Sequence, residues 1–371
     1  MTKRNSTFHV PTRVVAGIGS LDALSDAILS FGVTTVGVVA DRGVAEAGVL
    51  DQVTDVLPDG IAVTTMHIDP DPGVAATEQS CRTAREAGIE LVVGVGGGSA
   101  LGVAKAVALR LRNEKTIDAY EVGADPISHA PVPSIAIPTT AGSGSEVSRT
   151  LVLHEPGRSR ELIVTDERLA PNLAFLDGRL LRSLPVRPLT YAALDALSHA
   201  MESLWSRNSS FATEALAMSA ARTIVAKLPA ALAGVGDLNG SGDNDEVLQD
   251  LLEASCAANL ACGNSGLTLV HSLSSAIGIH VEHGHQNGIL LPAVARFNAA
   301  EVRPEVAALA ADITPMYEQI GFRPEFRHGT IPDGAAEMMI EAAASHPARH
   351  NNLKLATDDD LRTLLATVGA H

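Results

Sequence analysis

Short apolar runs alternate with helical segments in the first half of the chain, and this alternation restricts the fold more than any other feature. The apolar runs cover residues 8–15, 34–40, 61–68 and 90–95 and contain many β-branched side chains. Runs of this kind, separated by helices, are typical of parallel strands, because helices then cover both faces of the sheet. The sequence therefore predicts an α/β domain built on a parallel sheet.

The second half of the chain has a different composition. Beyond Leu184 and Pro185 it consists of Ala/Leu-rich helical segments with few β-branched runs. A chain of 371 residues is long enough for two domains. We therefore expect an α/β domain over residues 1–185 and an all-α domain over residues 186–371.

Charge and cysteine content narrow the classes of function. The net charge of −16 repels phosphate backbones and anionic lipid surfaces, so we expect no nucleic-acid or membrane partner. Three cysteines, Cys81, Cys256 and Cys262, are too few and too scattered for a disulfide framework. The first residues lack the apolar core of a signal peptide, and no apolar run reaches the length of a membrane span. We expect a cytoplasmic protein.

A glycine-rich turn stands between the fourth apolar run and a helix. Gly96, Gly97, Gly98 and Ser99 follow the strand, and the helix covers residues 100–111. Glycines let a backbone approach a ligand closely, and the first N–H groups of a helix bind phosphate oxygens. The turn therefore predicts a pyrophosphate site, although a tight turn without a ligand would have the same sequence.

A second polar segment follows the strand at 135–138. Its hydroxyl side chains are those of Thr139, Thr140, Ser143 and Ser145, interspersed with glycines. Hydroxyls at this density after a strand can bind ribose and phosphate oxygens. Taken alone, the segment is equally compatible with an ordinary polar loop.

Asp41 ends the second apolar run and bears on the choice of dinucleotide. A carboxylate there can accept a hydrogen bond from the ribose 2′-OH of NAD and would repel the 2′-phosphate of NADP. Its neighbour Arg42 could instead attract the 2′-phosphate of NADP. We favour NAD, with a simple helix cap at Asp41 as the alternative.

One carboxylate and several imidazoles form a candidate metal site in the helical half. Asp195 and His199 lie four residues apart in a Pro-free helical segment, so both project from one face. Such a pair alone is more often a surface pair than a ligand pair. The chain, however, adds further histidines nearby in the sequence, and this donor set suits a divalent first-row metal. These are His271, His280, His283 and His285.

These segments together resemble the iron-containing (group III) alcohol dehydrogenases. The resemblance rests on GGGS, PTTAGSGSEV, DALSHA, LVH and HGHQNG followed by ILLP, in that order along the chain. It implies a dehydroquinate-synthase-like architecture: a Rossmann-like dinucleotide-binding domain and a helical metal-binding domain. It also implies a homodimer that transfers a hydride between NAD, or NADP, and a small alcohol or aldehyde. The implied ligands of a divalent ion, iron or zinc, are Asp195, His199, His271 and His283.

Three positions depart from the pattern of that family: Ser275, Gly102 and Arg149. Ser275 stands where the family often has a second histidine for proton transfer, so His280 or His285 would have to serve. Gly102 resembles the maleylacetate reductases, a sister group that usually lacks the metal-binding Asp195. A metal-free reductase of that type is therefore one alternative, a lyase of the dehydroquinate-synthase type is another, and a binding protein without catalysis is a third.

Arg149 is unusual for the family at its position after Glu146-Val147-Ser148. A guanidinium binds carboxylates and related anions with two parallel hydrogen bonds. We therefore consider Arg149 a candidate for recognition of an acidic substrate, with a solvated surface arginine as the alternative.

Overall fold

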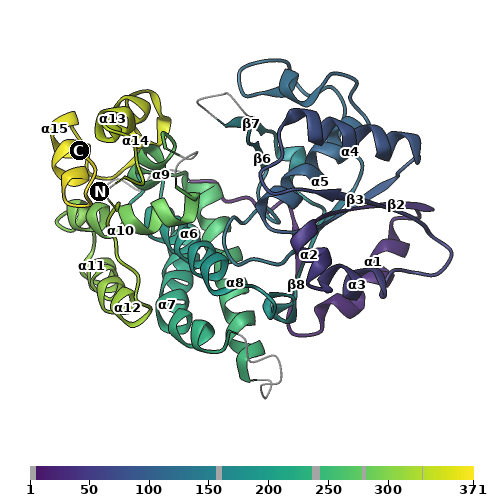
Figure 1. Cartoon of the computed structure of the whole chain (residues 1–371), viewed down its shortest axis with the longest axis horizontal. Coiled ribbons are helices and arrows are strands. Elements are labelled where there is room, and N and C mark those ends of the chain that lie inside the picture. Colours follow the sequence, from purple (N-terminus) through teal and green to yellow (C-terminus); the bar gives the residue numbers. More distant parts are fainter. Residues whose placement is uncertain (1–5, 156–160, 236–242, 278–280, 328) are drawn as a thin grey trace.

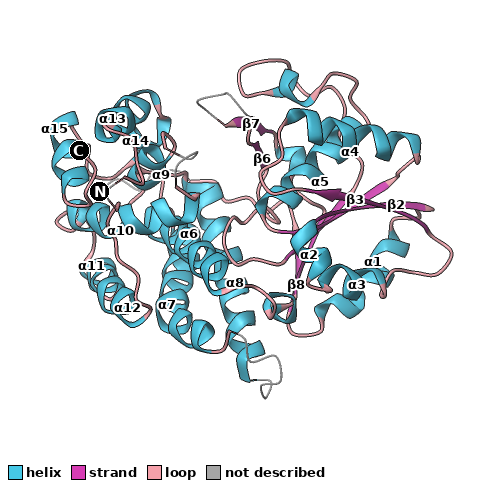
Figure 2. Cartoon of the chain, in the orientation of Figure 1, coloured by secondary structure: helices cyan, strands magenta, loops and turns pink. Residues whose placement is uncertain are grey.

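The computed structural model describes residues 6–155, 161–235, 243–277, 281–327 and 329–371. An α/β half and a helical half lie side by side, and the strands are confined to the first of them (Figures 1 and 2). The strands are β1 (Arg13–Ala16), β2 (Thr35–Asp41), β3 (Ala62–Ile68), β4 (Leu91–Gly96), β5 (Ser134–Pro138), β6 (Thr150–Leu153), β7 (Leu162–Thr165) and β8 (Leu173–Leu176).

Six of these strands form one sheet in the order β1-β8-β5-β4-β2-β3, and every neighbouring pair is parallel. The predicted parallel sheet is therefore confirmed. Strands β6 and β7 form a separate antiparallel pair. The first strand starts later than expected, because Pro11 cannot donate a ladder hydrogen bond. The backbone of His9 is instead bonded through its N–H and its carbonyl to the side chain of Asn264.

Helices cover both faces of the sheet. The helices of this half are α1 (Leu24–Ser30), α2 (Arg42–Glu46), α3 (Val49–Thr54), α4 (Val74–Glu86) and α5 (Gly98–Arg110). Side chains along β2 alternate between two cores: Val36, Val38 and Ala40 pack with α1 to α3, and Val39 packs with α4 and α5. Because both faces of β2 are buried, its sequence is one continuous apolar run.

The carboxyl ends of three adjacent strands bring the predicted cofactor segments together. Strands β5, β4 and β2 are neighbours and end at Pro138, Gly96 and Asp41. Ligands of open parallel sheets bind beyond this edge. The fold thus puts the glycine turn, the hydroxyl-rich segment and Asp41 at one edge of the sheet.

The second half is helical among the described residues. Its helices are α6 (Val186–Leu204), α7 (Phe211–Ala233), α8 (Asp243–Ser265), α9 (Leu269–Ser274), α10 (His283–Asn298), α11 (Pro304–Ala311), α12 (Ile313–Gln319), α13 (Ala335–Ser345), α14 (Pro347–Asn351) and α15 (Asp358–Ala366). By length and composition alone, α7 would be able to cross a membrane. It packs against α6 and α8, with side chains such as Ile224 and Leu228 buried, as a helix of a packed bundle does.

Glycines allow the segment after β5 to pack directly on the helical half. A Cβ on Gly142 would lie 2.8 Å from the Cα of Ala192 in α6, and a Cβ on Gly144 would lie 1.9 Å from the Cγ of Asn259 in α8. The amide of Asn259 donates to the carbonyl of Gly142 over 2.8 Å. These glycines therefore join the two halves, in addition to any part in binding a ligand.

We expect Gly144→Ala to lower the free energy of unfolding by about 3 kcal/mol, because the new methyl group overlaps Asn259 and the residue has a positive φ. The matched control is Gly263→Ala, where no atom lies within 4 Å of the added Cβ and the site is within α8. The control should change stability by about 1 kcal/mol or less, in the stabilising direction. Urea denaturation of both variants measures the difference, and equal stabilities would contradict the tight contact.

Candidate functional site

Helix α6 carries three functional groups on one buried face. Asp195, His199 and Glu202 are spaced by four and three residues, so they lie one above the other along the helix. All three are buried, and Glu202 is fully inaccessible. A buried carboxylate requires a partner of opposite charge or several hydrogen-bond donors, because desolvation otherwise forces it to accept a proton.

Helices α9 and α10 supply the imidazoles that surround Asp195. The Nε2 atoms of His271 and His283 each lie 3.6 Å from Asp195 Oδ1. Ligand atoms of these three residues all lie within 4.8 Å of one another, a spacing that a single metal ion can bridge. His199 Nε2 is 4.0 Å from the same oxygen, and its ring stacks on that of His271. The structure thus gathers all four predicted ligands, three of them tightly.

Two glycines let α10 approach α6 closely enough to form this cluster. A Cβ on Gly284 would lie 2.1 Å from the carbonyl oxygen of Tyr191, and one on Gly288 would lie 2.6 Å from Leu194 Cδ1. Gly284 follows His283 directly, and Gly288 lies one turn further along α10. Close packing at these two positions therefore sets how near the α10 side chains come to Asp195.

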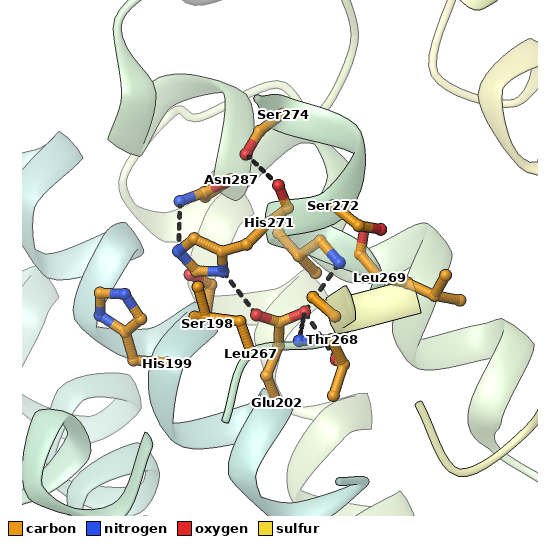
Figure 3. Close-up of polar contacts among 12 residues, drawn as sticks. Ser198, His199, Glu202, Leu267, Thr268, Leu269, His271, Ser272, Ser274 and Asn287 are labelled. Carbon is orange, nitrogen blue, oxygen red and sulfur yellow. Dashed lines mark hydrogen bonds and ion pairs between the residues drawn. The ribbon is translucent and has the colours of Figure 1, made fainter. Parts of the chain in front are cut away.

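Glu202 orients His271 by contacting Nδ1, the ring nitrogen on the side away from the cluster, as Figure 3 shows. Its carboxylate lies 2.5 Å from His271 Nδ1 and also accepts hydrogen bonds from the backbone N–H groups of Thr268 and Val270. These bonds and His271 outweigh burial and keep the pKa of Glu202 below its ordinary value. A proton held on Nδ1 leaves Nε2 directed at the cluster. The sequence interpretation missed Glu202, although its spacing from His199 put it on the same helical face.

The charges of the cluster are strongly coupled. Burial would raise the pKa of Asp195, but the surrounding imidazoles outweigh it and hold that pKa far below its usual range. Burial lowers the pKa of His199 to about 4. Burial also acts to lower the pKa of His271, yet Glu202 and Asp195 outweigh it and raise the value to about 9.

The residues present fit a divalent first-row metal. One carboxylate oxygen and up to three imidazole nitrogens form its preferred donor set. His199 Nδ1 is buried without a hydrogen-bond partner, which leaves a lone pair or an N–H uncompensated. The side chain of His283 is 47% exposed, so the cluster is open to solvent on that side. A site with buried ligands and one open side suits a metal that also binds a substrate.

The glycine turn and the hydroxyl-rich segment lie against each other at the edge of the sheet. The N–H of Thr139 donates to the carbonyl of Gly96 over 3.1 Å. A Cβ on Gly97 would touch Thr140, and a Cβ on Gly98 would lie 3.1 Å from Ser143. The structure thus forms a cradle from both predicted segments at the start of α5.

Other predicted cofactor residues are engaged by the protein itself. The hydroxyl of Ser99 lies 3.2 Å from a carboxylate oxygen of Asp71, and the N–H of Ser145 donates to the hydroxyl of Ser143. Both contacts lie beside the glycine turn. Ser145 is buried, so of these two serines Ser99 is the more accessible.

Asp41 has one carboxylate oxygen in each of two roles. Its Oδ1 accepts from the N–H of Val44 and caps α2, whereas its Oδ2 lies 2.7 Å from the position of a Cβ on Gly96. Asp41 therefore caps α2 and also lies beside the glycine turn. Arg42 forms an exposed ion pair with Asp69.

Arg149 lines a cavity of about 720 Å³ between the two halves, and His199 lines the same cavity. The guanidinium forms an ion pair with Glu167, which is also in the wall. Arg149 therefore shares a cavity with His199, but its guanidinium already has a carboxylate partner.

The two described candidates for proton transfer, His285 and Ser275, have their contacts outside the cluster. His285 stacks on Tyr191 with ring centroids 4.5 Å apart, and burial lowers its pKa. The hydroxyl of Ser275 donates to the carbonyl of Ser272 in its own helix. His280 lies outside the described residues.

Comparisons with known proteins identify the family. The profile of the iron-containing alcohol dehydrogenases matches residues 11–178, and the C-terminal profile of the Fe-containing alcohol dehydrogenase family matches residues 189–368. The probable alcohol dehydrogenase EutG of Salmonella typhimurium is 31% identical over 84% of this chain and 78% of its own length. The long-chain-alcohol dehydrogenase 1 of Geobacillus thermodenitrificans is 34% identical over 75% of this chain and 70% of its own.

A solved structure shares the fold over almost the whole chain. The sulfoacetaldehyde reductase of Bifidobacterium kashiwanohense, in complex with NAD+, superimposes with a TM-score of 0.89 at 26% identity and covers 99% of both chains. Its fold agrees with the parallel sheet and the helical half described above. The chain belongs to the iron-containing alcohol dehydrogenase family of oxidoreductases.

Proposed function

We propose that this protein transfers a hydride between a nicotinamide cofactor and a small alcohol or aldehyde, and that the reaction depends on a divalent metal. The observation that carries the proposal is the convergence of Asp195, His271 and His283 on one point, with Glu202 behind His271. A cluster of this kind is costly to bury without a cation, because several lone pairs lose their contact with water.

The metal would be held by Asp195, His199, His271 and His283, as iron or zinc. A divalent ion supplies Lewis acidity, which polarises a carbonyl oxygen or stabilises an alkoxide. The chain contributes the rest by orientation: Glu202 keeps His271 in one tautomer, and the close contact of α6 with α10 fixes the distances between the donors. Solvent and substrate would enter on the side of His283, the more exposed of the ligands that converge.

The cofactor would bind across the carboxyl ends of β2, β4 and β5. We propose that the pyrophosphate lies at the glycine turn, where the first N–H groups of α5 attract anions. The hydroxyls of the neighbouring segment and of Ser99 would bind phosphate and ribose oxygens. Oδ2 of Asp41, the oxygen that does not cap α2, would accept a hydrogen bond from the ribose 2′-OH, which favours NAD over NADP. The assigned residues are Asp41, Gly96, Gly97, Gly98, Ser99, Thr139, Thr140, Ser143 and Ser145.

The proton donor, the assembly and the location stay predictions. His285 is half-buried and its lowered pKa favours the neutral ring, which can accept a proton. Ser275 and His280 stay alternatives to it. A homodimer in the cytoplasm is what the resemblance and the composition lead us to expect.

The metal-free alternative differs in whether the reaction requires Asp195. A reductase of the maleylacetate type would not need Asp195, whereas here three imidazoles surround that carboxylate. The arrangement favours the metal-dependent reaction. Net oxidation of NADH, rather than transient use of NAD, would also separate it from a lyase.

We expect Asp195→Ala to remove bound metal and to lower aldehyde reduction by at least about a thousandfold, because the carboxylate is the one anionic ligand of the proposed four. Glu202→Gln keeps the ligands and should weaken metal binding by roughly 10- to 100-fold. Asp250→Ala, which removes an exposed partner of Lys227, serves as the control and should change neither.

Elemental analysis and NADH oxidation with a panel of aldehydes measure both effects. Full activity in a protein stripped of metal, or metal retained by Asp195→Ala, would contradict the proposed site.

For cofactor choice, the informative change is Asp41→Ser, because serine preserves the cap of α2 while the negative charge is removed. We expect the wild-type protein to prefer NADH, and the variant to use NADPH at least roughly tenfold better relative to NADH. Thermal unfolding should stay close to that of the wild type, which shows that the cap is intact. An unchanged ratio of the two kcat/KM values would leave Asp41 with the capping role alone.

We also propose that Arg149 favours anionic substrates, since it lines the cavity that reaches His199. A solved relative of the same fold is named a sulfoacetaldehyde reductase, whose named substrate is an anionic aldehyde. An anion would have to displace Glu167 from the guanidinium or share it.

Accordingly, Arg149→Ala should raise KM for acidic aldehydes about 10- to 100-fold, the value of one charged hydrogen bond, and leave neutral aldehydes nearly unchanged. Arg168→Ala is the matched control, because Arg168 pairs with Asp166 and is not in the wall of this cavity. Equal losses on acidic and neutral aldehydes would rule out the assignment.

A further inference from the structure

The amide nitrogen of Asn287 occupies the point on which the cluster converges. Nδ2 lies 2.8 Å from Asp195 Oδ1, 3.1 Å from His271 Nε2 and 3.0 Å from His283 Nε2. The side chain is fully buried. In Figure 3 the amide points from α10 toward the imidazole of His271, on the side opposite Glu202. The three nearest polar atoms are thus atoms that the proposed metal would bind.

The bonding of this amide is unbalanced. An amide nitrogen carries two N–H donors, but one carboxylate oxygen and two imidazole nitrogens lie within hydrogen-bond distance of it, and an imidazole nitrogen accepts only while it is unprotonated. At the other end, Oδ1 of Asn287 is buried without a hydrogen-bond partner. A buried unpaired carbonyl oxygen is unfavourable, because it has lost its hydrogen bonds to water. The orientation persists because the reverse one would direct the amide oxygen at the carboxylate of Asp195.

We propose that Asn287 substitutes for the cation in the metal-free protein. Its N–H groups supply partial positive charge where the ion would supply full charge, and so they keep the buried carboxylate and the imidazoles close together. The inference rests on the proposed metal site. Asn287 is here a positioning residue, which acts through the ligands.

Metal binding then requires a change at Asn287. An ion near the three acceptors would repel the N–H groups, because both carry positive charge. The ion can enter only after the amide has turned its N–H groups away from the three atoms. The amide therefore stabilises the metal-free cluster and weakens the apparent affinity for the metal, since each binding event must first break its hydrogen bonds.

Two substitutions separate this role from simple packing. Asn287→Ala removes the donors, and Asn287→Asp keeps the shape but replaces the donors by a second carboxylate beside Asp195. For protein stripped with a chelator, we expect the melting temperature to fall in the order wild type, Asn287→Ala, Asn287→Asp. For Zn²⁺ measured by competition with a chromogenic chelator, affinity should rise in that same order, at least tenfold for the aspartate.

Asn298 provides the matched control. It lies in the same helix, is fully buried, and bonds to Asn352 instead of the cluster. Asn298→Ala should lower the melting temperature of metal-free and Zn²⁺-loaded protein alike and leave Zn²⁺ affinity unchanged.

The outcomes distinguish this inference from the proposed function. Wild-type protein that binds no Zn²⁺ would overturn the metal site, and the inference with it. Wild-type protein that binds Zn²⁺, with weaker binding in both Asn287 variants, would overturn the inference alone and make Asn287 a supporting ligand. An unchanged melting temperature of metal-free Asn287→Ala would also overturn it.

Discussion

The buried carboxylate of Asp195 is the constraint on which the helical half depends. A negative charge removed from water must be matched by donors or cations at short range, or it takes up a proton. Here it is matched from α6 by His199 and from two other helices by His271 and His283. The contacts of His271 and His283 with this carboxylate therefore fix the positions of the short helix α9 and of the beginning of α10. Close packing between α6 and α10 is the structural means.

Glycines allow the close packing in this arrangement and also in the turn before α5. Gly284 admits α10 to α6, and Gly142 and Gly144 admit the segment after β5 to α6 and α8. The same helix α6 thus contacts the cofactor side and carries the metal side. A cavity lined by Arg149 and His199 lies between the two halves.

Local pattern predicted much of this architecture. The apolar runs predicted the parallel sheet, and the spacing of Asp195 and His199 predicted that they share a face. Thr357 and Asp360 form the capping box of α15, and the three aspartates at the start of this helix are visible in the sequence. These features depend on residues close together in the sequence, so their periodicity is visible without a structure.

Contacts between distant segments could not be predicted in the same way. Glu202 acquires its role from His271, Thr268 and Val270, which come from another part of the chain. Asn287 was visible as part of a motif, but its position at the centre of the cluster depends on how α10 is rotated against α6. The same rotation turns His285 toward Tyr191. Helix rotation follows from packing, which no local pattern specifies.

Anomalous X-ray diffraction from crystals of the metal-loaded protein, recorded at the absorption edges of iron and zinc, tests the central claim most directly. We predict one strong peak in each protomer, about 2.0–2.2 Å from the donor atoms of Asp195, His199, His271 and His283. The edge at which it appears identifies the ion. A loaded and active protein without a peak at this cluster, or with its peak at other residues, would contradict a metal-dependent reaction at Asp195.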